Sequence, residues 1–145
     1  HCISLPAGHF GGRYVEDLFM GTLSGQAHED FADLTAARVS AHLLIRRCGA
    51  LLQFVAFDQA AWHAGTSSYL GHQGCNDFSI GIELEGTDTA PYSEIQYAVL
   101  GSVVSALQDH YQMQSSAVVG HVDIAPGRKT DPGPAFDWEK FWHCC

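Results

Sequence analysis

The chain has 145 residues, of which 46% are hydrophobic and 16% are charged, a composition typical of one globular domain. Its net charge is −9, with seven Lys and Arg against sixteen Asp and Glu, and so few basic residues argue against a nucleic-acid partner. No apolar run approaches the roughly 20 residues that a membrane-spanning helix requires, so we expect no membrane partner either.

Hydrophobic periodicity predicts helices and strands that alternate along the chain. The expected elements are, in chain order, helices near 13–20 and 26–37, strands at 39–45 and 51–57, a long loop at 60–78, a strand at 79–85, a helix at 93–111, a strand at 117–121, a proline-rich loop at 122–136 and a last helix from 137. Cys48-Gly49 suggests a hairpin between the first two strands. This order predicts an α/β domain with helices packed on a sheet.

Two of these elements carry further information. In the strand at 79–85, apolar residues alternate with Glu83 and Glu85, which predicts one apolar face and one carboxylate-bearing face. In the helix at 93–111, Ser93 and Gln96 form a capping-box pattern. We expect its core-facing stripe to comprise Ile95, Val99, Ser102, Val103, Ala106, Leu107 and His110.

The five cysteines are odd in number and form no Cys-x-x-Cys pair. Reduced thiols in a cytoplasmic protein are the simpler interpretation, although sequence alone does not fix cysteine connectivity. The chain starts at His1 and not at Met, and we interpret this as the loss of a short N-terminal segment. With no repeat or linker, we expect a single catalytic domain over 1–145 that acts as a monomer.

The segment from His121 to Asp131 holds the richest chemistry. It places a histidine at a strand end, then a loop stiffened by Pro and Gly, then Lys129 and Asp131 on one side of an extended stretch. Catalytic zinc takes three ligands of these types and leaves one position for water. Glu83 is the candidate general base. The same spacing also fits a surface ion pair, and a lone histidine is more often structural than a ligand.

Five runs of sequence resemble the 1,6-anhydro-N-acetylmuramoyl-L-alanine amidases of Gram-negative bacteria, a branch of the zinc amidases that share their fold with peptidoglycan-recognition proteins. The runs are HCISLP from residue 1, VSAHLLIR from 39, AWHAG from 61, CNDFSIGIELEGTD from 75 and GH through to Trp138. The resemblance spans essentially the whole chain. It implies a mixed central β-sheet flanked by helices, with the active site at the surface of the sheet.

The resemblance also implies residue roles. His1, His121 and Asp131 would bind one Zn²⁺, Glu83 would be the acid/base residue, and Lys129 the cation beside the scissile carbonyl. The substrate would be an anhydro-muropeptide, cleaved between the lactyl group and L-alanine. Such enzymes act in cytoplasmic recycling of the cell wall and so dampen the induction of β-lactamase. In these relatives an apolar strand precedes the first ligand and Asn follows it, whereas here Cys2 follows.

Substrate contacts can be proposed from residue chemistry. Arg38 and Arg128 suit the carboxylates of the stem peptide, because a guanidinium binds a carboxylate through two hydrogen bonds, and Trp62 could stack on the anhydro-sugar. We interpret His63 as a structural or pocket-lining residue and His42 as a core histidine. Two alternatives remain: a non-catalytic muropeptide-binding protein, and a secreted or phage amidase that lyses intact wall.

Overall fold

A computed structural model describes residues 1–145 and contains a four-stranded mixed sheet in the order β1-β6-β2-β3. The strands are β1 (Cys2–Ile3), β2 (Leu43–Ile45), β3 (Leu51–Gln53) and β6 (Ile82–Glu85). Strand β6 runs parallel to both of its neighbours, and β2 pairs antiparallel with β3 through a tight turn at Gly49. The predicted mixed sheet is therefore confirmed, and so is the predicted hairpin, which β2 and β3 form.

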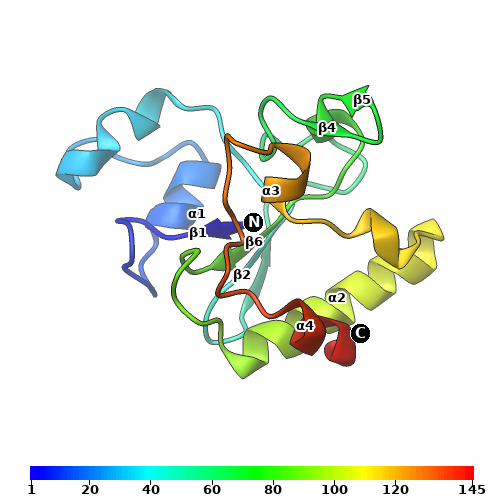
Figure 1. The fold of residues 1–145 in the computed structure, drawn as a ribbon. Coiled ribbons are helices and arrows are strands. Elements are labelled where there is room, and N and C mark those ends of the chain that lie inside the picture. Colours follow the sequence, from blue (N-terminus) through cyan, green and yellow to red (C-terminus); the bar gives the residue numbers. More distant parts are fainter.

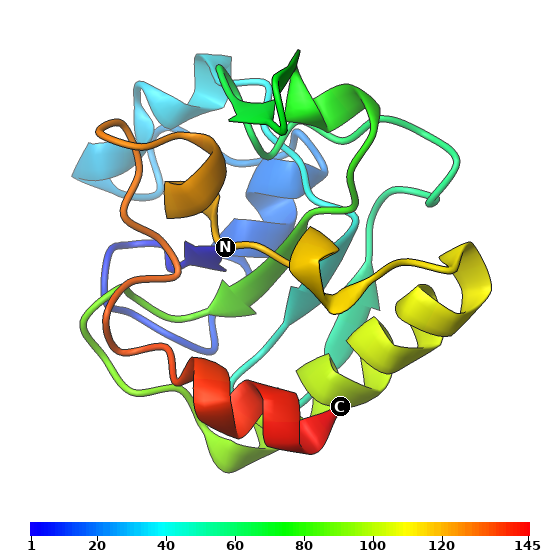
Figure 2. The ribbon, with the colours of Figure 1, turned by 45° about the vertical axis from the view of Figure 1, so that its right-hand side comes forward.

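The helices lie on both sides of this sheet (Figures 1 and 2). They are α1 (Tyr14–Phe19), α2 (Glu94–Tyr111), α3 (His121–Ile124) and α4 (Trp138–Cys144). Helices α2 and α4 lie side by side in both views and contact each other extensively. A small hairpin, β4 (Ser68–Tyr69) and β5 (His72–Gln73), lies within the segment predicted as a long loop. None of the helices is long and apolar enough to cross a membrane.

Alternation along the strands gives the sheet two different faces. Ile45 and Leu84 point to one face and form the main core with apolar residues of α2 and α4, Phe141 among them. Glu83 and Glu85 point to the other face, where Arg46 bridges Glu85 to Glu16 of α1. Both glutamates are buried, so the carboxylate-bearing face is covered by protein and is not a solvent-facing surface.

Helix α2 begins where its capping box predicts. The Ser93 side chain accepts from the Gln96 backbone, and the Gln96 side chain accepts from the Ser93 backbone. The buried Gln96 amide also donates to the carbonyls of Ile45 and Glu85, which fixes the helix start against the ends of β2 and β6.

The predicted stripe of this helix is wrong at most of its positions, although Leu107 is buried and Val99 packs against the core. Ile95, Ser102, Ala106 and His110 are exposed, and the buried residues are Gln96, Tyr97, Leu100, Gly101, Val104 and Leu107. The helix carries apolar residues on more than one side, and the docking of α4 decides which side is buried: a Cβ at Gly101 would overlap Cys144.

Two other predicted elements are also wrong. The helix expected at 26–37 is a pair of single 3-10 turns, η1 (Glu29–Phe31) and η2 (Leu34–Ala36). The strand expected at 117–121 does not form, because the extended residue Val118 has no partner strand and His121 already begins α3. All five cysteines are free thiols.

Candidate metal centre

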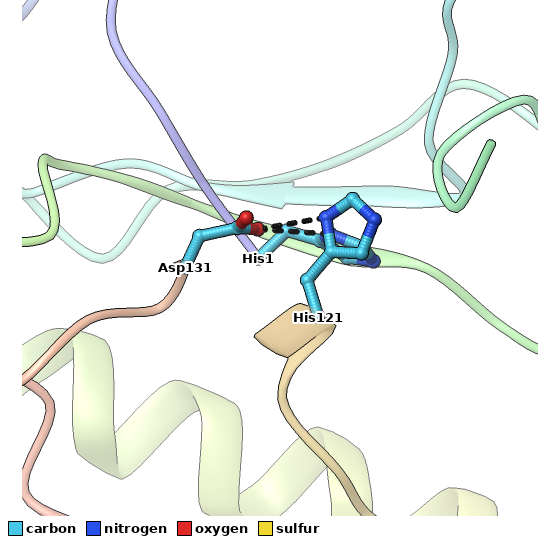
Figure 3. A group of neighbouring side chains, drawn as sticks. All are labelled: His1, His121 and Asp131. Carbon is cyan, nitrogen blue, oxygen red and sulfur yellow. Dashed lines mark hydrogen bonds and ion pairs between the residues drawn. The ribbon is translucent and has the colours of Figure 1, made fainter. Parts of the chain in front are cut away.

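Three side chains from distant parts of the chain converge on one point (Figure 3). Nδ1 of His1 lies 2.9 Å from Nδ1 of His121, and Oδ2 of Asp131 lies 3.1 Å from each of these two nitrogens. The three potential ligand atoms thus form a nearly equilateral triangle. These are the residues that the sequence resemblance implies as metal ligands, and the structure brings them together.

Strand pairing places His1 beside Glu83. The backbone of His1 bonds to Ile82 and Leu84 of β6, so Glu83 lies directly across from it on the neighbouring strand. Paired residues project to the same face, so both side chains enter the site. Cys2 projects to the opposite face, against the apolar core, and takes no part in the metal group.

Local hydrogen bonds place the other two ligands. The Asp123 side chain accepts from the backbone of Gly120 at 2.7 Å and closes the start of α3, which His121 begins. The backbone of Val122 donates to the Asp131 carbonyl at 3.0 Å, so both ends of the 121–131 segment are tied together. The shape of this segment is thus set by hydrogen bonds within it, and side-chain bonds such as that of Arg128 to the Ala64 carbonyl attach it to the neighbouring loop.

The geometry of the triangle fits a metal ion. Nε2 of His121 lies 3.0 Å from the carbonyl of Ala64, and because a carbonyl only accepts, this contact places the ring proton on Nε2 and the lone pair on Nδ1. Arg128 Nη2, 3.3 Å from the same Nε2, donates to the Ala64 carbonyl. Three donor atoms about 3 Å apart repel one another unless a cation lies between them. Four-coordinate zinc with bonds of about 2.0–2.1 Å holds its ligands about 3.3 Å apart, close to the spacing found here.

The acidity of Asp131 suits a ligand. Burial alone would raise the pKa of its carboxyl, but the interaction of this carboxyl with His121 outweighs burial and holds the pKa below its usual value. Metal binding requires the ionised carboxylate, which this environment favours.

Glu83 lies beside the triangle in a different environment. Burial, with a smaller contribution from the nearby Asp131, outweighs opposing positive charges and raises the pKa of its carboxyl to about 7. Its Oε2 is buried and has no hydrogen-bond partner. A carboxyl that gains and loses a proton near neutral pH, with one oxygen left free, suits a group that transfers protons.

The remaining sequence candidates line one shallow pocket of about 200 Å³ next to the triangle. His121 forms part of its wall, and the candidates in it are Arg38, Trp62, Arg128 and Lys129. Trp62 is 59% exposed, so it is available to a ligand and is not a core residue. Arg128 differs, since its guanidinium already donates to the carbonyls of Ala64 and Thr66.

Two histidines complete the surroundings. His42 is buried between the Gln59 carbonyl and the Gly81 amide, the core role predicted for it. Nδ1 of His63 lies 3.0 Å from Nε2 of His1, and burial, followed by nearby positive charge, lowers the pKa of His63 to about 4. His63 thus touches a ligand without being one, a contact that nothing in the local sequence pattern signals.

Comparison with known proteins gives a consistent result. Residues 13–134 match the N-acetylmuramoyl-L-alanine amidase family. The chain is 58% identical over 141 residues to the 1,6-anhydro-N-acetylmuramyl-L-alanine amidase AmpD of Escherichia coli, covering 97% of this chain and 77% of that protein. It is 47% identical over 142 residues to the Haemophilus influenzae protein of the same name, again covering 97% of this chain and 77% of that protein.

Solved structures agree in fold. A crystal structure of a selenomethionine derivative of AmpD matches with a TM-score of 0.97 and 55% identity, over 99% of this chain and 80% of that one. The Escherichia coli amidase AmiD, solved with anhydro-N-acetylmuramic acid-L-Ala-D-γ-Glu-L-Lys, matches with a TM-score of 0.69 and 35% identity, over 80% of this chain and 51% of that one.

Proposed function

The chain belongs to the N-acetylmuramoyl-L-alanine amidase family, and on this premise we propose that it is a zinc-dependent anhydro-muropeptide amidase. It hydrolyses the amide bond between the lactyl group of 1,6-anhydro-N-acetylmuramic acid and the L-alanine of the stem peptide. The observation that carries the proposal is the triangle of His1, His121 and Asp131 beside a buried, proton-accepting Glu83.

His1, His121 and Asp131 hold the metal in this proposal. A bound zinc ion would polarise the scissile carbonyl and make a water molecule more acidic. Three protein ligands would leave a coordination position open for this chemistry. The chain's own groups perform the proton transfers and the charge stabilisation around it.

Glu83 is the general base and then the general acid. Its carboxylate accepts a proton from the attacking water, and its carboxylic acid returns that proton to the nitrogen of the departing L-alanine. The pKa of about 7 supports both roles, because each protonation state is accessible near neutral pH. The oxygen without a partner supports the same assignment, since no protein group competes for its lone pairs.

Lys129 stabilises the oxyanion of the tetrahedral intermediate. It lines the pocket that His121 also lines, and its positive charge lies close enough to influence Glu83. In the same pocket Arg38 and Trp62 contact the stem peptide and the sugar, and their exposure supports this assignment. Arg128 already donates to two main-chain carbonyls, and it contacts the substrate through its remaining N–H donors.

Substrate choice tests the function. Purified protein loaded with zinc is given a soluble anhydro-muropeptide and, separately, intact sacculi, and release of free stem peptide is measured. We expect cleavage of the soluble substrate at a rate at least about tenfold above that for sacculi. Preference for sacculi would assign the chain to wall lysis, and binding without cleavage of either substrate would assign it to muropeptide sensing.

The Glu83→Gln variant tests the mechanism. It should bind zinc in the same ratio as the wild type while hydrolysis falls by at least about 10³-fold, because the amide has no proton to exchange at neutral pH. Near-normal turnover in this variant would remove Glu83 from the mechanism. A role in cytoplasmic wall recycling accords with the free cysteines, and cell fractionation with an antibody to the chain tests it.

A further inference from the structure

His1 makes contacts through both of its ring nitrogens. Nδ1 faces the other two ligands, and Nε2 lies 3.0 Å from Nδ1 of His63. A histidine can bind a metal only through a nitrogen that carries a lone pair, so its function depends on where the ring proton is held. The group that receives the Nε2 proton therefore matters as much as the ligand itself.

The hydrogen bonds around His63 determine where that proton lies. Ser79 Oγ lies 2.5 Å from the Cys75 carbonyl, and because a carbonyl only accepts, the single hydroxyl proton of Ser79 points there. Ser79 can then only accept from Nε2 of His63, 3.4 Å away. With its proton on Nε2, His63 presents a lone pair on Nδ1, and His1 donates to it from Nε2.

The consequence for His1 is direct. A proton on its Nε2 leaves a lone pair on Nδ1, the atom that faces Asp131 and His121. His121 reaches the same state through the Ala64 carbonyl. Adjacent residues of one loop thus orient the two histidine ligands, one through a side chain and the other through the main chain.

The surroundings hold the ring of His63 in place. Asn76 Oδ1 accepts from the backbone amides of His63 at 3.0 Å and of Ala64 at 2.7 Å, and these bonds anchor the loop that carries both residues. Gly81 leaves room for the ring, because a Cβ at that position would overlap it. The backbone and the ring of His63 are therefore both held by the surrounding protein.

We propose that His63 is a positioning residue that holds His1 in the tautomer able to bind zinc through Nδ1. The proposal rests on the metal centre of the proposed function. In zinc sites, losing the group that accepts the second ring proton of a ligating histidine lowers metal affinity about 10–100-fold. The position of His63 next to His1 in space, 62 residues away in sequence, gives it that role.

Two substitutions separate hydrogen bonding from packing. In His63→Asn, the side-chain oxygen stands near the place of Nδ1 and still accepts from His1, although the ring is lost. In His63→Leu, the bulk is largely kept but no acceptor remains. We expect zinc affinity, measured by competition with a chromophoric chelator, to fall about 10–100-fold in His63→Leu and by less than about threefold in His63→Asn.

The control variant is His110→Leu, which removes an exposed histidine from α2 and should leave zinc affinity unchanged. Circular dichroism of each metal-free variant verifies folding. Nitrogen NMR of the zinc-loaded protein reports the tautomer of His1 directly. We expect Nε2 of His1 to be protonated in the wild type and in His63→Asn.

The outcomes are distinct. Equal affinity in wild type and His63→Leu, or lower affinity in His63→Asn than in His63→Leu, overturns the positioning role and leaves the metal centre standing. A wild type that binds no zinc overturns the metal centre itself. Rescue by Asn together with loss in Leu supports the role, because packing alone predicts the reverse order.

Discussion

The two halves of the metal site are built in different ways. Glu83 lies on β6 and His1 immediately precedes the parallel strand β1, and backbone hydrogen bonds between the two segments set their spacing. His121 and Asp131 lie on a short helix and the loop after it, where side-chain contacts do the same work. The strand half depends on residues far apart in the sequence, and the loop half is contained within eleven consecutive residues.

The two halves should therefore respond differently to substitution. Substitutions in the strand half change the charge and burial of groups that the sheet holds in place. Substitutions in the loop half change the position of its ligands, because side-chain hydrogen bonds such as that of Asp123 hold this segment in shape.

The largest effect is expected from removing a ligand of the loop half. Asp131→Ala takes away one corner of the triangle, so zinc affinity should fall by more than about 100-fold and hydrolysis should follow. Zinc content after dialysis, measured by atomic absorption, gives the result. Asp109→Ala, on the exposed side of α2, is the control. Full zinc content in Asp131→Ala would exclude this carboxylate as a ligand.

In the strand half, Glu83 should make stability depend on pH in the metal-free protein. Its folded pKa of about 7 exceeds the unfolded value of 4.5, so the folded state binds the proton more tightly. Stability is therefore lost as pH rises from 4.5 through 7, by about 2 kcal/mol between pH 5 and pH 8.

Urea unfolding of the wild type and Glu83→Gln measures this effect. The free energy of unfolding of the variant minus that of the wild type should grow by about 2 kcal/mol over the same interval, because the amide does not titrate. The difference cancels the contribution of the nine histidines, which both proteins share. A constant difference would mean that the carboxyl of Glu83 titrates normally.

The smallest effect concerns two tyrosines of the core. The Tyr92 hydroxyl donates to the Pro132 carbonyl at 2.8 Å, next to Asp131, while the Tyr97 hydroxyl accepts from the Asp137 backbone at 2.8 Å, at the start of α4. Either change to Phe should cost about 1 kcal/mol of stability. Only Tyr92→Phe should weaken zinc binding, by a few-fold, because of these two bonds only that of Tyr92 reaches the ligand loop.

Tyr97→Phe is therefore a matched control for Tyr92→Phe, in the same cluster with the same atom removed. Thermal unfolding and chelator competition on both variants provide the comparison. Equal zinc affinity in the two variants would show that the loop half is held without the bond to Pro132.

The same contrast explains what could be predicted from the sequence. His121 and Asp131 were accessible because a stiff local segment brings them together, and the start of α2 because its capping box is local. The role of His1 as a ligand is predicted only through the resemblance, since the contacts of His1 are long-range. The contact between His1 and His63 was missed for the same reason.

The errors have a related cause. The stripe of α2 was misplaced because Gly101 is the docking point of α4, and no pattern within the helix shows that. Val118 and Val119 favour a strand by propensity, but a strand also requires an edge to pair with.

The pairing of β1 with β6 has a consequence for the quality of a protein preparation. A slip of one residue in β1 would turn His1 away from the site and bring Cys2 into its place. A mispaired molecule would then present the Cys2 thiolate, which also binds zinc, where the native site has the imidazole of His1. The ligand set of the bound metal, with or without sulfur, should therefore distinguish chains whose strands are in register from chains whose strands are not, and so serve as an assay of correct folding.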